Sequence, residues 1–246
     1  MAQSDYDLDH LRQEFAPSGT LRCALNHGNV VLVRRGPSDD TPSGVSVDLA
    51  RELALRLDLP IRFRHYDKAE AVSDGAGSDE WDVCFLAIDP KRAEQIAYSD
   101  PYVLIEGAYL LRRGSAALTP GDVDRQQLKI GVVKGSAYEL HLTRTGQGGN
   151  LIRFSSFGDA VSSLDAGELD GLGGVRQAMQ KVAAEHPAFE VMVEPFMTIP
   201  QAMGVSVLKP IAARFLKTFI KEMTMSGMVS RSLAASGQTD VIVPAI

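Results

Sequence analysis

One stretch of 22 residues, Trp81 to Tyr102, constrains the possible folds of this chain more than any other. A continuous apolar run, Val83 to Leu86, lies near its start and is typical of a parallel strand buried on both faces. The pair Asp89-Pro90 follows and predicts the start of a helix, with Asp89 as the N-cap and Pro90 in the first turn. Arg92 then falls in that first turn, beside the carboxyl end of the strand.

Arg92 is the strongest candidate for a ligand-binding residue in this stretch. Open α/β sheets bind ligands at the carboxyl ends of their strands, and the start of a helix offers N–H groups to an anion. A guanidinium beside those donors matches a carboxylate, which it binds through two parallel hydrogen bonds. A surface arginine paired with Glu94 or Asp89 is the alternative interpretation of the same residues.

Strands and helices alternate along most of the chain. Short apolar strands are separated by segments in which apolar residues recur at helical spacing, among them 46–57, 157–164 and 175–182. Such alternation predicts an α/β architecture in which a mostly parallel sheet is flanked by helices. We place a crossing into a second series of strands and helices after Arg112, and the return crossing within 196–207.

Composition and charge exclude several classes of protein. The chain has 246 residues, 45% of them hydrophobic, which is enough for one large domain or two lobes with their own cores. Its formal net charge is −6 and no basic run is present, so nucleic acid is not an expected partner. No apolar run approaches the roughly 18 residues of a membrane span. We find no metal-binding cluster, nucleotide loop or other cofactor motif.

The N-terminal segment bears on the compartment. Residues 1–15 contain acidic side chains and no apolar core, so they do not have the pattern of a secretory signal. We therefore expect a cytoplasmic protein as the sequence stands, and a periplasmic one if a signal has been removed.

Several short motifs occur in a characteristic order. They are Gly44–Leu49, Asp82-Val83, Asp89-Pro90-Lys91-Arg92, Ser99-Asp100-Pro101-Tyr102, Gly131–Val133 with Gly135-Ser136, and Leu169–Leu172. In this order they resemble type II periplasmic solute-binding proteins of the amino-acid-binding kind, over roughly residues 19–237. The resemblance implies two lobes with a hinge cleft between them, which we assign to 1–112 with 200–246 and to 113–199. It also implies that Arg92 clamps the carboxylate of the ligand.

The second lobe offers a partner for that carboxylate. Gly135-Ser136 precedes a predicted helix, so its N–H groups and the Ser136 hydroxyl are candidates to contact the ligand. Ser136 and Glu139 also form a capping-box pattern, in which they bond the helix's own N–H groups, and both interpretations can hold together. The complete predicted ligand site is Arg92, Ser136, Asn26, Asn29, Ala87, Tyr138, Arg176 and Gln201. For the two asparagines, ordinary turn chemistry is the alternative.

The chain departs from the pattern of the family that it resembles at three places. Val175 stands about where amino-acid binders carry an aspartate that holds the ligand's ammonium group. In the turn Leu86-Ala87-Ile88-Asp89 one hydroxyl that is usual in the family is missing, and Asp89 stands in the place of a threonine. We therefore expect a small organic acid or amino-acid-like ligand, with a preference for acids that lack an α-ammonium group.

The resemblance implies solute binding, either as the substrate-binding part of a transport system with a membrane permease or as a soluble binding protein. We expect a monomer. The alternative is an enzyme on the same fold, a lyase or dehydratase that works by acid/base elimination. Its available titratable groups are Glu139, His141, His27 and Asp89. A sensory or regulatory module is a third use of this fold.

Overall fold

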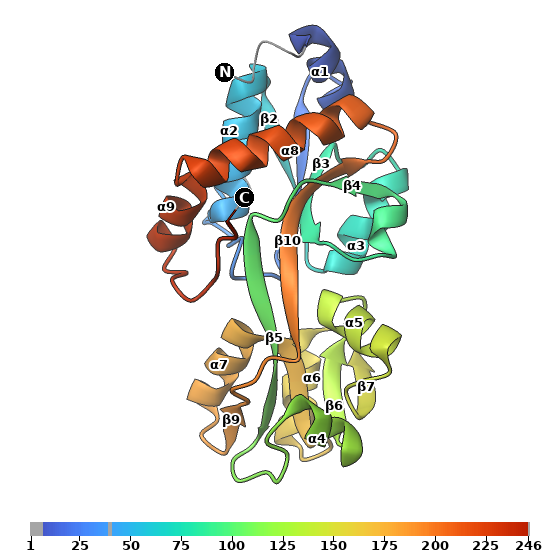
Figure 1. Cartoon of the computed structure of the whole chain (residues 1–246), viewed down its shortest axis with the longest axis vertical. Helices are drawn as coiled ribbons and strands as arrows, with labels where there is room; N and C mark the ends of the chain where they lie inside the picture. The colour runs from blue at the N-terminus through green and yellow to red at the C-terminus, as the bar shows by residue number, and fades with distance from the viewer. Residues whose placement is uncertain (1–6, 39–40, 246) are drawn as a thin grey trace. The chain divides into compact units, whose positions relative to one another are not determined.

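The computed structural model describes residues 7–38 and 41–245 (Figure 1). Residues 1–6, on which the signal-sequence prediction partly rests, lie outside the described part. The chain divides into two compact units: unit 1 is Met1–Leu104 with Pro200–Ile246, and unit 2 is Ile105–Ile199. The first crossing therefore lies inside strand β5 (Val103–Arg112), whereas the sequence analysis places it after Arg112. The predicted α/β class with two lobes is confirmed.

Unit 1 is built on a mixed sheet. Its strands follow the order β2-β1-β3-β10, and β4 pairs with β10. The bounds are β1 (Leu21–Asn26), β2 (Ile61–Tyr66), β3 (Val83–Ala87), β4 (Ile96–Tyr98) and β10 (Met197–Ser206). β1 is parallel to both β2 and β3, as the apolar runs predict, whereas β10 is antiparallel to β3 and β4. The returning strand therefore makes the sheet mixed.

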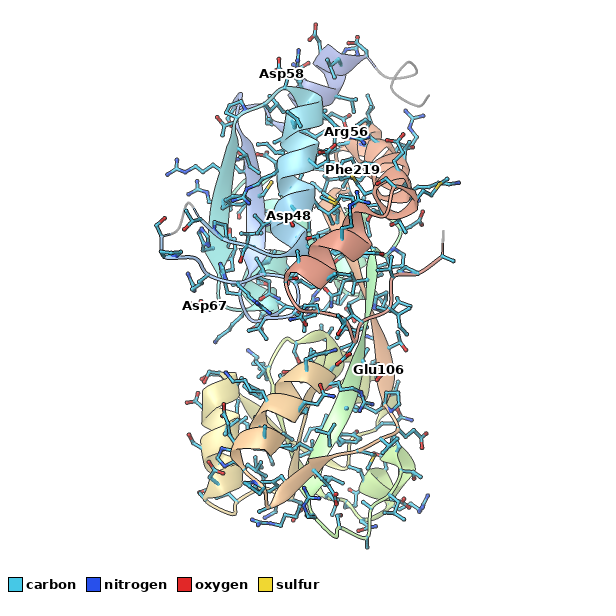
Figure 2. All side chains as sticks on the ribbon, turned by 90° about the vertical axis from the view of Figure 1, so that its left-hand side faces the viewer. Asp48, Arg56, Asp58, Asp67, Glu106 and Phe219 are labelled. Atoms are coloured by element: carbon cyan, nitrogen blue, oxygen red, sulfur yellow. The ribbon has the colours of Figure 1, made fainter. Side chains whose placement is uncertain are left out.

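Helices of unit 1 bury their apolar stripes. They are α1 (Leu8–Phe15), α2 (Val45–Leu57), α3 (Ala69–Asp74), α8 (Pro210–Met225) and α9 (Met228–Ala235), with the short turn η2 (Gly75–Gly77). Leu49, Leu53 and Leu57 of α2 are all fully buried, which confirms the predicted helical face. On the more exposed side of α2, the Arg56 guanidinium lies 5.2 Å from the ring centroid of Phe219 in α8 (Figure 2). No helix in the described ranges is both long and apolar enough to cross a bilayer.

Unit 2 repeats the α/β plan on a smaller scale. Its strands follow the order β5-β8-β6-β7, with β9 paired to β5. The other elements are α4 (Pro120–Arg125), β6 (Lys129–Val133), α5 (Ala137–Thr145), β7 (Asn150–Phe154), α6 (Phe157–Asp165), β8 (Gly171–Val175), α7 (Arg176–Glu185) and β9 (Phe189–Val191). β6, β7 and β8 are parallel, whereas β5 is antiparallel to β8. Leu110, Leu164, Leu172 and Met179 belong to one buried cluster that joins the sheet to α6 and α7.

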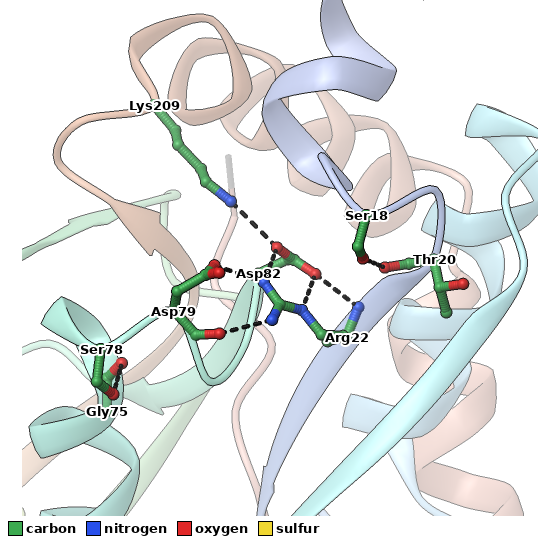
Figure 3. Close-up of polar contacts among 8 residues, drawn as sticks. All are labelled: Ser18, Thr20, Arg22, Gly75, Ser78, Asp79, Asp82 and Lys209. Carbon is green, nitrogen blue, oxygen red and sulfur yellow. Dashed lines mark hydrogen bonds and ion pairs between the residues drawn. The ribbon is translucent and has the colours of Figure 1, made fainter.

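A buried carboxylate fixes the amino end of β3 in unit 1 (Figure 3). Asp82 is fully buried and accepts hydrogen bonds from the backbone N, Nε and Nη2 of Arg22, each at 2.9 Å. Lys209, at the start of α8, donates to the same carboxylate at 3.2 Å. Hydrogen bonding to Asp82 and Asp79 raises the pKa of Arg22 despite the opposing effect of burial. Asp82, the first residue of the motif around Arg92, is thus structural.

Candidate functional site

The segment after β3 is a short turn rather than the predicted α-helix. Arg92–Glu94 forms a single 3-10 turn, η3. The Asp89 carboxylate accepts the Lys91 N–H at 2.9 Å, and the Asp89 carbonyl accepts the Ala93 N–H at 2.9 Å. The prediction of a helix was wrong because the chain enters β4 at Ile96 and pairs with β10. A turn of three residues has little dipole, so the Arg92 side chain is the anion-binding feature that remains.

Arg92 is buried at the carboxyl end of β3. Its side chain is 5% exposed, so it is not the surface arginine of the alternative interpretation. The Nη1 group donates to the Ala87 carbonyl at 3.3 Å, which folds the guanidinium back onto the end of the strand. Burial lowers the pKa of Arg92, while Tyr98, Asp89 and Cys84 nearby oppose that change. The result is a desolvated cation at the sheet edge where ligands bind in open α/β folds.

Two other predicted residues lie at the same place. Ala87, the last residue of β3, pairs with Gln201 of β10, and the Ile88 N–H donates to the Pro200 carbonyl at 2.9 Å. Both Ala87 and Gln201 are 4% exposed. The structure therefore brings Arg92, Ala87 and Gln201 together within unit 1.

The loop after β1 combines turn chemistry with an unpaired acceptor. Asn26 Oδ1 accepts the Gly28 N–H at 3.1 Å, which is the turn role that was the alternative for this residue. Asn29 differs, because its Oδ1 is buried and has no hydrogen-bond partner among the described residues. His27 is not an isolated loop histidine: its Nε2 lies 2.7 Å from Nδ1 of His65, and the two rings stack.

Ser136 in unit 2 caps helix α5. Its hydroxyl accepts the Glu139 N–H at 3.1 Å, as the capping-box pattern predicts. The Glu139 carboxylate, however, accepts the N–H of Gly135 at 3.1 Å, and the Ser136 N–H donates to the Val133 carbonyl at 3.2 Å. The backbone N–H groups of Gly135 and Ser136 are thus used inside the protein. The Ser136 hydroxyl also has internal partners, the Glu139 N–H and the Tyr138 side chain, so a ligand at this place would share the hydroxyl with them or displace Tyr138.

The remaining two predicted residues have internal roles in unit 2. Tyr138 is 8% exposed, and burial raises its pKa to about 12. Arg176 begins α7 and donates to Glu106 of β5 at 2.5 Å, and to the carbonyls of Met192 and Val193 at 3.1 and 2.9 Å. Glu106 is labelled on β5 in Figure 2. Arg176 therefore ties three segments of unit 2 together.

Sequence reasoning missed the partners of these residues. Glu106 is separated from Arg176 by 70 positions, and Arg153 of β7 reaches Glu139 from 14 positions away. Neither pairing has a local sequence signal, because each depends on strand neighbours that only the folded sheet defines. The sequence shows only that each pair joins an acidic residue to an arginine.

Comparison with protein families matches residues 34–233 to the bacterial extracellular solute-binding proteins, family 3. The matched range includes six of the eight predicted ligand-binding residues, and Asn26 and Asn29 precede it.

Individual proteins show the same likeness. The membrane-bound lytic murein transglycosylase F of Maricaulis maris is 30% identical over 148 residues, 56% of this chain and 32% of that protein. The chain thus spans about a third of the transglycosylase's length. The glutamine-binding protein of Geobacillus stearothermophilus is 20% identical over 194 residues, 77% of this chain and 71% of that protein.

A solved structure supports the fold independently. An amino acid ABC transporter substrate-binding protein from Streptococcus pneumoniae, bound to L-arginine, has a TM-score of 0.76 at 17% identity. The superposition covers 91% of this chain and 97% of that one.

Proposed function

We propose that this chain, which belongs to the bacterial extracellular solute-binding proteins of family 3, binds a small carboxylate-bearing solute and holds the carboxylate with Arg92. The observation that carries the proposal is the desolvated guanidinium of Arg92 at the carboxyl end of β3. A guanidinium in such a place attracts an anion, and its planar fork matches the two oxygens of a carboxylate. Gln201 and Ala87, which pair beside it, carry no charge, and the nearest acidic group is Asp89.

The proposed solute lacks an α-ammonium group, or does not depend on one for binding. Val175 stands at the carboxyl end of β8, and the resemblance to amino-acid binders implies an aspartate at about this position in those proteins. An ammonium group transferred from water to this place would lose hydration without gaining an opposite charge from residue 175. Ala87 likewise supplies no hydroxyl, so Arg92 carries more of the carboxylate recognition.

We further propose that Ser136 contributes its hydroxyl to the solute, and that the chain serves a transport system with a membrane permease as its partner. The names of the relatives support the transport role, since one is a glutamine-binding protein and a similar structure is an ABC transporter substrate-binding protein. A periplasmic location would suit that role.

Binding is favoured over catalysis because three of the four titratable groups considered for an enzyme have identified structural partners. Glu139 is tied to Arg153, and Asp89 caps its own turn. His27 stacks on His65. The likeness to a transglycosylase covers about a third of that enzyme, so it adds little to the case for an enzyme.

The test is a matched panel of probes. L-arginine and L-glutamine are each compared with a counterpart lacking the carboxylate, agmatine or γ-aminobutyramide, and with one lacking the α-amino group, deamino-arginine or glutaramate. We expect at least one carboxylate to raise the melting temperature and to be recovered unchanged by mass spectrometry, since saturating ligand stabilises by about 2.7 kcal/mol at 100 times Kd. The carboxylate-free counterparts are expected to have no effect. Chemical change of a probe would instead indicate an enzyme, and binding that is indifferent to the carboxylate would contradict the proposal.

A further inference from the structure

The loop 134–136, between β6 and α5, is hydrogen-bonded to a buried carboxylate. Glu139 is 5% exposed, and its Oε2 accepts the N–H of Gly135 at 3.1 Å. Gly135 has a φ of 72°, a conformation that side-chain-bearing residues rarely adopt. Glu139 therefore helps to hold the backbone in an unusual turn directly before Ser136.

The other oxygen of Glu139 joins a ring of three side chains. Oε1 accepts from Nε of Arg153 at 2.7 Å and from the hydroxyl of Thr143 at 2.8 Å. Arg153 also donates from Nη2 to the Thr143 hydroxyl at 2.8 Å, which closes the ring. Arg153 lies on β7 opposite Val132 of β6, and the Lys134 N–H bonds the Phe154 carbonyl at 3.0 Å. The loop before Ser136 is thus fixed to both α5 and β7.

The charges in this ring matter for an anionic solute. Ser136 is the N-cap of α5, and Glu139 lies three residues later in the first turn. An uncompensated Glu139 carboxylate would repel a second carboxylate brought to the Ser136 hydroxyl, because like charges within one helical turn interact strongly in a partly desolvated place. Arg153 cancels that charge while the hydrogen bond to Gly135 is kept.

We infer that Glu139 and Arg153 are positioning residues for the solute, which together fix the loop 134–136 and present Ser136 with the negative charge of Glu139 compensated. The inference rests on the proposed function, and it assigns Glu139 to positioning rather than to acid/base catalysis. It predicts how binding depends on the charges of Glu139 and Arg153. Losing Arg153 alone should harm the binding of a carboxylate more than losing both charges.

The experiment compares the wild type with Arg153→Gln, Glu139→Gln and the double variant. Arg125→Gln is the matched control, since it makes the same substitution in an exposed ion pair of unit 2, with Asp122. Dissociation constants are measured by calorimetry for L-arginine and glutaramate, and the Gly135 amide is followed by nuclear magnetic resonance without solute.

Of the two carboxylate probes, we consider the one that the wild type binds more tightly. Arg153→Gln should raise its dissociation constant by about fivefold to tenfold, and the double variant should recover part of this loss. Arg125→Gln should leave binding within about twofold, as an exposed pair contributes little. The Gly135 amide should shift in Glu139→Gln and stay unchanged in Arg125→Gln.

Unchanged affinity in Arg153→Gln and Glu139→Gln, with only lower melting temperatures, would overturn the inference and leave the proposed function intact. An unshifted Gly135 amide in Glu139→Gln would overturn the positioning role without any solute. Failure of the wild type to bind any carboxylate probe would overturn the proposed function, and the inference would fall with it.

Discussion

The carboxylate of Asp82 is fully buried and takes three hydrogen bonds of 2.9 Å from Arg22. Asp82→Asn should destabilise unit 1 by about 2–4 kcal/mol, because a neutral amide removes the buried counter-charge of Arg22 and leaves it only the exposed Asp79. Urea unfolding of the two proteins measures this difference.

Asp79→Asn is the matched control for that variant. Asp79 accepts from the same guanidinium at 2.6 Å, but its side chain is 80% exposed, and asparagine tolerates its positive φ. We expect little change in stability. Equal losses of unfolding free energy in the two variants would show that the burial of Asp82 does not account for its contribution to stability.

The pair Glu139–Arg153 predicts a pH dependence of stability. Burial alone would raise the pKa of Glu139, but hydrogen bonds from Arg153, Thr143 and the Gly135 N–H outweigh it and lower the pKa. A folded pKa below the unfolded value of about 4.3 stabilises the protein fully above that pH, and the contribution is lost as pH falls through the folded pKa.

Glu139→Gln removes the titration. At pH 7 it should cost about 1–3 kcal/mol, reduced by the partial exposure of Arg153, and the gap between variant and wild type should close as pH falls from about 5 to 3. A gap that stays constant over this range would contradict the assignment.

Val175→Asp should introduce a preference for α-amino acids. Val175 is the N-cap of α7 and makes no side-chain capping bond, so aspartate there can cap the helix as well as attract an ammonium group. We expect the preference for L-glutamine over glutaramate to rise by about tenfold or more, the scale of one charge-assisted hydrogen bond.

Val175→Asn separates capping from charge. Asparagine caps a helix as well as aspartate does but carries no charge, so it should stabilise α7 without changing the preference between the two probes. An equal change in preference in both variants would argue against a role for charge at this position.

Local patterns in the sequence predicted much of the fold and parts of the site. The spacing of Leu49, Leu53 and Leu57 defines the buried face of α2, because helical periodicity is local information. The same is true of the Ser136 cap. Arg92 was placed correctly at the end of β3, since a buried apolar strand and the residues after it are neighbours in sequence.

Features set by distant residues were not predictable in this way. Asp89-Pro90 is compatible with the start of an α-helix and with a 3-10 turn. The turn forms because Ile96–Tyr98 pairs with β10, which lies about a hundred positions later in the sequence. Arg176 looked available for a ligand until the antiparallel register of β5 and β8 placed Glu106 beside it.

The most direct test of the account is the effect of Arg92→Lys on carboxylate recognition. Lysine keeps the positive charge but lacks the planar fork. The binding of glutaramate, which has a carboxylate and no α-ammonium group, should therefore weaken by about tenfold to a hundredfold. Calorimetry would compare L-arginine with agmatine, and glutaramate with butyramide, in the wild type and the variant. We predict a loss confined to the carboxylate-bearing member of each pair. Equal affinities in wild type and variant, or equal losses with and without the carboxylate, would contradict the claim that Arg92 holds the carboxylate of the solute.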